Sequence, residues 1–367
     1  MNQKIQWLRN KIGMLNMQGI IVSNPINIKY LTGLESEGVL LITRKENNFL
    51  TDARYLEDVR ATLTIDDEII VDNIANITPD DYENFFMFCE NVGFEENYVT
   101  YAMYKKYMQR YKIHNLEETE YLIEKARMIK EEKEISLIEK ACNITDDCFE
   151  HICEFIKIGK TEKEIAKEIE YFFENNEADL AFETIVASGK NSSKPHAIPT
   201  DKKIEAGDTI TIDMGCKYKG YCSDMTRTIF AGFVPIEVKK IYDLVLKNQN
   251  QTLKEMKDSV NIKFVSRMVE SDFKLNGFDL VHSLGHGVGL EVHEMPYING
   301  KNDGVLKENM VVTSEPGIYL SNRFGVRIED TVLITKSGCI NLSKSDKNYI
   351  IVDRTWFKIE VMIKLWS

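Results

Sequence analysis

The chain has 367 residues, of which 43% are hydrophobic and 28% are charged, and its formal net charge at pH 7 is −12. This composition is that of an ordinary globular protein, and the length allows two domains with separate cores. The negative charge argues against nucleic acid or an anionic membrane as a partner. No stretch reaches the apolar length of a membrane span, and the N-terminus lacks the apolar core of a signal peptide.

Cysteine usage indicates the redox environment. The number of cysteines is odd, no Cys-x-x-Cys pair occurs, and several cysteines fall at apolar positions of expected helices. We therefore expect reduced, mostly buried thiols and a cytoplasmic location. The seven cysteines are Cys89, Cys142, Cys148, Cys153, Cys216, Cys222 and Cys339.

Helix and strand patterns alternate in the first third of the chain. Leu8, Ile12 and Leu15 are spaced to form one face of an opening helix. This alternation predicts an α/β domain over residues 1–124. Its other expected elements are strands at 19–22, 38–42 and 49–51 and a helix from Tyr55.

The composition turns to charge between Ala126 and Lys133, and we place the second domain at residues 125–352. A long helix is expected from Ile135 to Ile152, because its apolar residues recur near helical spacing.

Two further helices are expected in this domain. Thr161 and Glu164 form a capping-box pattern, which predicts a helix continuing through Phe172. A third helix is expected at about 235–256, and the remaining segments are predicted to be short strands and glycine-rich turns.

The most informative feature is a set of five side chains in the C-terminal half. Four carboxylates and one imidazole suit one or two hard or borderline divalent ions such as Mn²⁺. The five candidate metal ligands are Asp213, Asp224, His286, Glu315 and Glu329.

A predicted hairpin brings the first two of these carboxylates together. Residues 209–214 alternate strictly, so Asp213 lies on the face opposite Ile212. After a turn at 217–220, the returning strand can bring Asp224 opposite Asp213. A divalent cation would make such a pairing of like charges favourable. Two unrelated, solvated aspartates are the alternative.

Histidines gather near the third candidate ligand. Three of the six histidines, His282, His286 and His293, fall within twelve residues, among three alternating glycines that allow close backbone approach. The Lys-Ser/Thr ending of a phosphate loop is absent, and His293-Glu294 lacks the second histidine of a zincin helix. A fourth histidine, His196, follows Pro195.

Glu315 precedes Pro316-Gly317, and Glu329 shares one face of an alternating strand with Arg327. A simple ion pair between Arg327 and Glu329 is the alternative to a metal ligand. A carboxylate that bridges two metals explains Glu329 better, given the other four candidates.

Together these motifs resemble the metallopeptidases with the pita-bread fold, specifically the branch of Xaa-Pro aminopeptidases and prolidases. The resemblance extends to about Val352, and residues 24–33 and 51–55 resemble the creatinase-like N-terminal domain of that branch. It implies an α/β (α+β) fold: a creatinase-like domain followed by a catalytic domain with two similar βαβ halves.

The resemblance also implies roles for the candidate residues. Asp213 would chelate one ion, His286 and Glu315 would hold the other, and Asp224 and Glu329 would bridge. His196 and His293 would contact the substrate or the tetrahedral intermediate, and His282 would line the pocket on the proline side. Arg327 would orient Glu329 or help to close the site.

The implied activity is hydrolysis of the Xaa-Pro bond at the N-terminus of peptides through a metal-bridged hydroxide. Two metals about 3.5–4 Å apart lower the pKa of a shared water, and Glu315 is the best placed carboxylate to take its proton. Two Mn²⁺ ions are expected, with Co²⁺ or Zn²⁺ as alternatives. The expected ligands are proline-containing peptides, and the expected assembly is a homodimer.

Related activities fit less well. Creatinase lacks the metal ligands, methionine aminopeptidase lacks the long N-terminal domain, and a non-enzymatic peptide-binding relative would be expected to lose ligands. Some compact prolidases carry an arginine that grips the carboxylate of a dipeptide, where this chain has Tyr297. The sequence therefore favours longer Xaa-Pro peptides, with dipeptides as the alternative. Residues 353–367 depart from the family, and their role is open.

Overall fold

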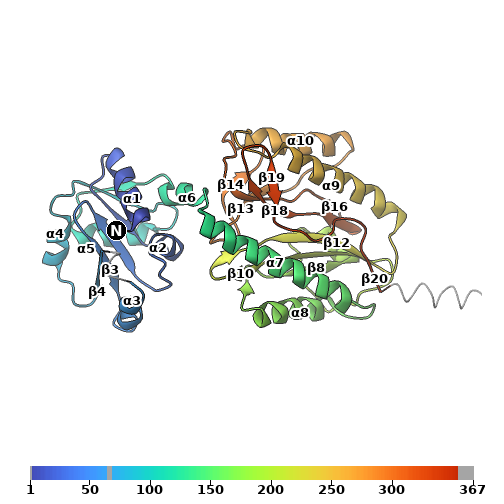
Figure 1. The fold of residues 1–367 in the computed structure, drawn as a ribbon, viewed down its shortest axis with the longest axis horizontal. Coiled ribbons are helices and arrows are strands. Elements are labelled where there is room, and N and C mark those ends of the chain that lie inside the picture. Colours follow the sequence, from blue (N-terminus) through green and yellow to red (C-terminus); the bar gives the residue numbers. More distant parts are fainter. Residues whose placement is uncertain (1, 64–67, 354–367) are drawn as a thin grey trace, which may run out of the picture. The chain divides into compact units, whose positions relative to one another are not determined.

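The computed structural model describes residues 2–63 and 68–353. It separates into two compact units, one ending at Arg127 and the other beginning at Met128 (Figure 1). The division expected after residue 124 falls inside helix α6 (Leu122–Arg127), which the first unit keeps whole. Apart from Asp353, the expected tail 353–367 lies outside the described residues. Across the described residues, no helix is both long and apolar enough to span a membrane.

The first unit is built on a six-stranded mixed sheet with the strand order β4-β3-β2-β1-β5-β6. Its strands are β1 (Gly19–Val22), β2 (Val39–Thr43), β3 (Asn47–Thr51), β4 (Ile69–Asn73), β5 (Asn91–Phe94) and β6 (Asn115–Glu118). Its other helices are α1 (Gln3–Met14), α2 (Pro25–Thr32), α3 (Leu56–Thr62), α4 (Pro79–Phe86) and α5 (Tyr101–Tyr111).

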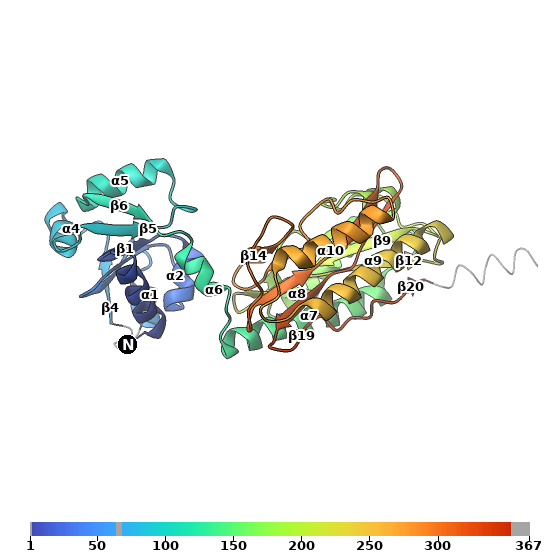
Figure 2. The same ribbon diagram turned by 90° about the horizontal axis from the view of Figure 1, so that it is seen from above.

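Alternation along β1 explains why helices cover both faces of this sheet. Ile20 and Val22 join the core under α1 and α2, whereas Ile21 joins the core under α4 and α5 (Figure 2). The expectation for Leu15 was wrong: α1 ends at Met14, and Leu15 is 49% exposed.

The first half of the second unit pairs two helices with an antiparallel sheet. Helix α7 (Glu132–Phe155) and helix α8 (Glu162–Asn175) bury apolar stripes against the sheet β20-β12-β9-β8. The predicted capping box is confirmed, since Thr161 and Glu164 exchange hydrogen bonds at the start of α8. The strands are β8 (Ile185–Ser188), β9 (Thr209–Met214), β12 (Met225–Ala231) and β20 (Ile351–Val352).

Short segments complete this half. A small sheet contains β7 (Asp179–Leu180), β10 (Cys216–Tyr218) and β11 (Tyr221–Cys222), and a 3₁₀ helix, η2, spans Gly189–Ser193.

The second half repeats this plan with helix α9 (Ile236–Glu255) and helix α10 (Ile262–Leu275). The sequence prediction missed α10, which begins at an Asn261 cap and buries Val265, Val269 and Phe273. The strands are β13 (Gly285–Gly287), β14 (Glu294–Ile298), β15 (Val311–Ser314), β18 (Asp330–Ile334) and β19 (Cys339–Asn341), with the hairpin β16 (Gly317–Leu320) and β17 (Phe324–Arg327).

The two halves resemble each other in their helix pairs. Helices α7 and α8 lie over one sheet, and α9 and α10 lie over the other (Figure 1). In each half, the residue that caps the N-terminus of the second helix also forms an isolated β-bridge. Thr161 pairs with Lys203 in the first half, and Asn261 pairs with Val305 in the second. The strand ends that carry the acidic residues Asp213, Asp224, Glu315 and Glu329 line a cavity of about 480 Å³.

Candidate metal centre

All ten residues that the sequence marked for metal or substrate line this one cavity. The first half contributes Asp213 from β9 and Asp224 from the segment before β12. The second half contributes the other three candidate ligands, from β13, from the end of β15 and from the start of β18. The remaining lining residues of the predicted set are His196, His282, His293, Tyr297 and Arg327.

The candidate ligand atoms form three overlapping groups, each with its members within 4.8 Å of one another. His286 Nε2 lies 3.5 Å from Asp224 Oδ2 and 3.6 Å from Glu315 Oε1. The groups are Asp213 with Asp224 and Glu329, His286 with Glu315 and Glu329, and Asp224 with His286 and His293. Asp224 and Glu329 are the carboxylates that belong to more than one group.

The hairpin register differs from the sequence expectation. Thr226, not Asp224, is the direct partner of Asp213, because β9 and β12 pair Met214 with Met225. Asp224 lies two residues before Thr226 in the chain, and its side chain is therefore on the same face as that of Thr226. The two carboxylates therefore meet diagonally at the cavity rather than directly opposite each other.

The cavity holds more negative charge than its own donors satisfy. Oδ1 of Asp213 and Oε1 of Glu329 are buried without a hydrogen-bond partner. Burial, together with the charge of Asp213, raises the pKa of Glu329 to about 7. Burial and the charge of Glu329 also raise the pKa values of Asp224 and Glu315 well above their usual range. Buried oxygens without donors and crowded carboxylates fit one or two divalent cations.

His286 is held as a neutral ligand. Burial and the neighbouring His293 lower its pKa to about 4. Its Nδ1 lies 3.2 Å from the carbonyl of Gly287, so Nδ1 carries the proton and Nε2 is free to bind a metal. A Cβ at Gly285 would lie 2.1 Å from the carbonyl oxygen of Thr313, so the strands beside His286 approach as closely as the glycine pattern predicts.

Arg327 contacts Asp213 directly and Glu329 through a threonine. Its Nη2 donates to Asp213 Oδ2 at 2.6 Å. Its Nε donates to Thr226 Oγ1, which in turn donates to Glu329 Oε2 at 2.7 Å. Arg327 Nη1 also reaches the carbonyl of Pro195 at 3.2 Å, next to His196.

The sequence analysis did not mark Tyr319, which contacts two residues of the cavity. The hydroxyl of Tyr319 accepts a hydrogen bond from Arg327 at 2.7 Å and lies 3.0 Å from His282 Nε2. Burial lowers the pKa of His282 to about 4, so its imidazole is neutral. Tyr319 lies on β16 in a hairpin that sequence alternation does not place beside His282, and no signal in the sequence links the two.

The other histidines and Tyr297 lie nearer the solvent. His196 and His293 are exposed at the cavity, with the ring of His293 4.3 Å from that of His286. Tyr297, on β14, is 47% exposed. Among the lining residues, Arg327 is the cation with a permanent charge, and it is already paired with Asp213.

Comparison with known proteins identifies a family model for each unit. Residues 136–336 match metallopeptidase family M24, and residues 4–129 match the creatinase/prolidase N-terminal domain. The chain is 37% identical to an uncharacterized peptidase, YqhT, of Bacillus subtilis over 355 residues, covering 95% of this chain and 100% of the relative.

Solved structures show the same fold over nearly the whole length. The Xaa-Pro dipeptidase from Bacillus anthracis has a TM-score of 0.90 at 35% identity, covering 95% of this chain and 99% of that chain. The X-Pro aminopeptidase from Thermotoga maritima has a TM-score of 0.84 at 31% identity, covering 94% and 100%.

Proposed function

The chain belongs to metallopeptidase family M24, and on this premise we propose that it hydrolyses the bond between the first residue and a following proline in peptides. The observation that carries the proposal is the cavity itself. Four carboxylates, two of which have a buried oxygen without a hydrogen-bond partner, face one neutral imidazole, and three more histidines lie around them. The similarity to proteins described as Xaa-Pro dipeptidase and X-Pro aminopeptidase supports the substrate class.

Two divalent ions are part of the proposal, with Mn²⁺ as the expected metal. Asp213 would hold one ion, His286 and Glu315 the other, and Asp224 and Glu329 would bridge, which agrees with their membership of two groups each. Bound divalent ions supply a water of lowered pKa and polarise the scissile carbonyl.

The protein's own groups complete the reaction. Glu315 is the proposed base, which accepts a proton from the attacking water and returns it to the leaving nitrogen. His196 and His293 would donate hydrogen bonds to the carbonyl oxygen as negative charge develops on it. His282 would face the pyrrolidine ring, whose nitrogen carries no N–H to be recognised.

Substrate length is the finer part of the proposal. A dipeptide would bring its free carboxylate to the half-exposed stretch occupied by Tyr297, where a tyrosine rather than a cation would meet it. No ion pair would then offset the partial desolvation of the carboxylate. Arg327 is unsuited to replace that cation, because its guanidinium donates to Asp213 and Tyr319. A longer peptide would carry its terminal charge towards solvent, so we propose Xaa-Pro-Xaa peptides as the better substrates.

The test is a comparison of kcat/KM for Gly-Pro and Gly-Pro-Xaa tripeptides, with chelator-treated protein loaded with Mn²⁺, Co²⁺ or Zn²⁺. The tripeptide should be cleaved faster, after its first residue, and Tyr297→Arg should shift the preference towards the dipeptide. Turnover of dipeptides alone would support the alternative, a prolidase, and absence of turnover on both would contradict the proposed function. The homodimer and the cytoplasmic location stay predictions.

A further inference from the structure

Behind two of the proposed metal ligands lies a buried polar layer. Strands β15 and β18 pair with Ser314 opposite Asp330. Glu315 follows Ser314, and Glu329 precedes Asp330, so both carboxylates extend from the same end of this strand pair. Because successive side chains alternate, Ser314 and Asp330 face away from the cavity that Glu315 and Glu329 enter.

Gln249 of α9 spans the two strands from behind. Its Oε1 accepts a hydrogen bond from Ser314 Oγ at 2.6 Å, and its Nε2 donates to Asp330 Oδ2 at 3.0 Å. The three side chains are fully buried. The orientation of the amide is fixed by its partners, since the ionised Asp330 carboxylate can only accept.

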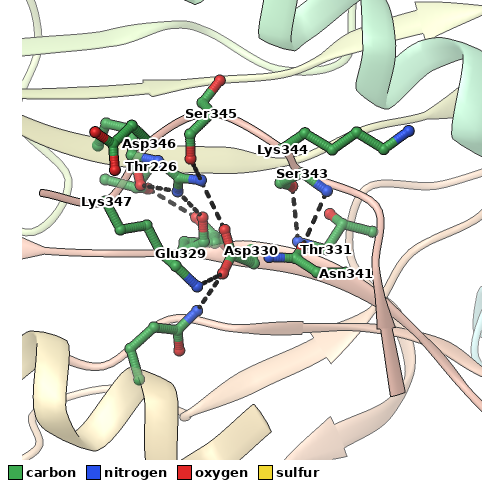
Figure 3. A network of polar contacts seen from close by, with 12 residues as sticks. Thr226, Glu329, Asp330, Thr331, Asn341, Ser343, Lys344, Ser345, Asp346 and Lys347 are labelled. Atoms are coloured by element: carbon green, nitrogen blue, oxygen red, sulfur yellow. Dashed lines mark hydrogen bonds and ion pairs between the residues drawn. The ribbon is translucent and has the colours of Figure 1, made fainter.

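Asp330 is also held by two cations (Figure 3). Arg227 donates to Asp330 Oδ1 at 2.7 Å, and Lys347 donates to Asp330 Oδ2. Arg227 further donates to the backbone carbonyl of Glu329 and, at 2.9 Å, to that of Ser345. The backbone carbonyl of Glu329 and the side chain of Asp330 are therefore both held by groups that do not enter the cavity.

We propose that Gln249 and Asp330 are positioning residues that set the separation of Glu315 and Glu329 for metal binding. The Gln249 amide joins the residues that adjoin the two ligands, so a shift of either strand must break one of its two buried hydrogen bonds. Breaking such a bond leaves a desolvated polar group, which resists the shift. This inference rests on the proposed function only in taking Glu315 and Glu329 as metal ligands.

The test is Mn²⁺ titration of the chelator-stripped full-length protein, followed by electron paramagnetic resonance of the free ion. Gln249→Leu removes both hydrogen bonds at similar volume and should weaken Mn²⁺ binding about 10-fold. This is the lower end of the loss seen when a direct partner of a metal ligand is removed, because Gln249 acts through the residue next to each ligand. Ser314→Ala breaks only one of the bonds and should weaken binding less.

Asn248→Leu is the matched control. Asn248 is the preceding residue of α9, is equally buried, and donates to the carbonyl of Leu244 and to Asp272 on α10 rather than to the ligand strands. Its replacement should lower the melting temperature but leave Mn²⁺ affinity at the wild-type value. Wild-type affinity in folded Gln249→Leu, or equal losses in both leucine variants, would overturn the proposal.

A swap of the two partners tests the hydrogen bond itself. Asp330→Asn should weaken Mn²⁺ binding, because Arg227, Gln249 and Lys347 all donate to Asp330, and an asparagine must turn its own amide donor towards Arg227 or towards the other two. Adding Gln249→Glu restores one donor and one acceptor and keeps the net charge, so the double variant should recover part of the affinity. A folded double variant without recovery would contradict the claim that this bond positions the ligands.

Metal binding is measured without peptide, which separates this inference from the proposed function. A protein that binds Mn²⁺ in a Gln249-dependent way but cleaves no Xaa-Pro peptide would overturn the proposed substrate alone. A protein that cleaves these peptides while Gln249→Leu binds Mn²⁺ normally would overturn the positioning role alone.

Discussion

The two halves of the catalytic unit support their ligands from behind with different polar groups. In the first half, Thr145 of α7 lies 2.7 Å from the hydroxyl of Ser223, the residue before Asp224. In the second half, Gln249 of α9 binds Ser314, the residue before Glu315, and also Asp330. In each half the first long helix therefore contacts a buried serine that directly precedes a candidate metal ligand.

The difference between these contacts follows from how many ligands each half must hold in register. The first half carries Asp213 inside the ladder of β9 and β12 and Asp224 one residue before it, so this ladder holds one of the two residues directly. A short hydroxyl contact is enough there. In the second half Glu315 and Glu329 lie beyond the ends of two strands, where the ladder has stopped. A longer amide, with Arg227 and Lys347 beside it, holds these ends together.

Removing the proposed bridging carboxylate of either half should have the largest effect. Asp224→Asn and Glu329→Gln should each lower kcat/KM about 10³-fold or more, a loss of ~4 kcal/mol of transition-state stabilisation, because each weakens the hold on two cations. Chelation should abolish the activity of the unmodified protein, and added Mn²⁺ or Co²⁺ should restore it, as measured by peptide hydrolysis.

Asp201→Asn serves as the control for these variants, because Asp201 is an exposed carboxylate of the first half that pairs with Lys163. Near-normal turnover in either bridging variant would contradict two jointly held ions, and full activity in rigorously metal-free protein would contradict metal catalysis altogether.

The next largest effect concerns one histidine from each half. His196→Ala and His293→Ala should each lower kcat by ~10²-fold, because each removes a donor to the developing oxyanion. Metal content, measured by mass spectrometry, should stay nearly intact. His293 lies within 4.8 Å of Asp224 and His286, so it is the stricter test. Loss of metal in either variant would place that histidine among the ligands.

The sequence predicted the residues of this site better than their connections. Strict alternation placed Asp213 on the polar face of a strand. The glycines around His286 predicted that neighbouring strands approach closely, and the short distance between Gly285 and the carbonyl oxygen of Thr313 confirms this. Both signals are local. The hairpin register depends on β10 and β11, which pair with each other and leave a turn of two residues, 219–220, where four were expected. This shifts the register by two residues, so the partner of Asp213 is Thr226.

The buried polar layer of Ser314, Gln249 and Asp330 could not be foreseen for a related reason. Gln249 lies on a predicted helix, but nothing in its neighbourhood indicates that it meets Asp330, 81 residues away. Tyr319 and His282 are likewise joined only by the folded chain. Helix α10 was a different failure. Its apolar residues recur at helical spacing with polar residues between them, so the amphipathic pattern was present in the sequence and was overlooked.

Breaking the first-half contact should have a smaller effect than breaking its counterpart. Thr145→Val should reduce the free energy of unfolding by about 1 kcal/mol, because it removes one buried hydrogen bond. Mn²⁺ affinity should fall less than in Gln249→Leu, since Ser223 still accepts from the backbone N–H of Cys216 at 3.0 Å. A loss equal to that of Gln249→Leu would show that the two contacts are equivalent and would remove the distinction drawn between the halves.

The smallest expected effect distinguishes the halves by pH. Helices α7 and α8 are joined by His151 and Glu168, whereas α9 and α10 are joined by Lys247 and Asp272. The hydrogen bond from Lys247, helped by Asn248, holds the pKa of Asp272 below its usual range. A lowered carboxylate pKa adds stability above the unfolded pKa of about 4, and this stability is lost as the pH falls through the folded pKa. Because Asp272 is partly exposed, the pair should contribute only ~0.2–1 kcal/mol to the free energy of unfolding.

Asp272→Asn should therefore lower the midpoint of urea unfolding slightly at pH 7. The difference in midpoint between variant and wild type should shrink as the pH is lowered. A gap that persists at the lowest pH would show that Asp272 acts through packing rather than charge.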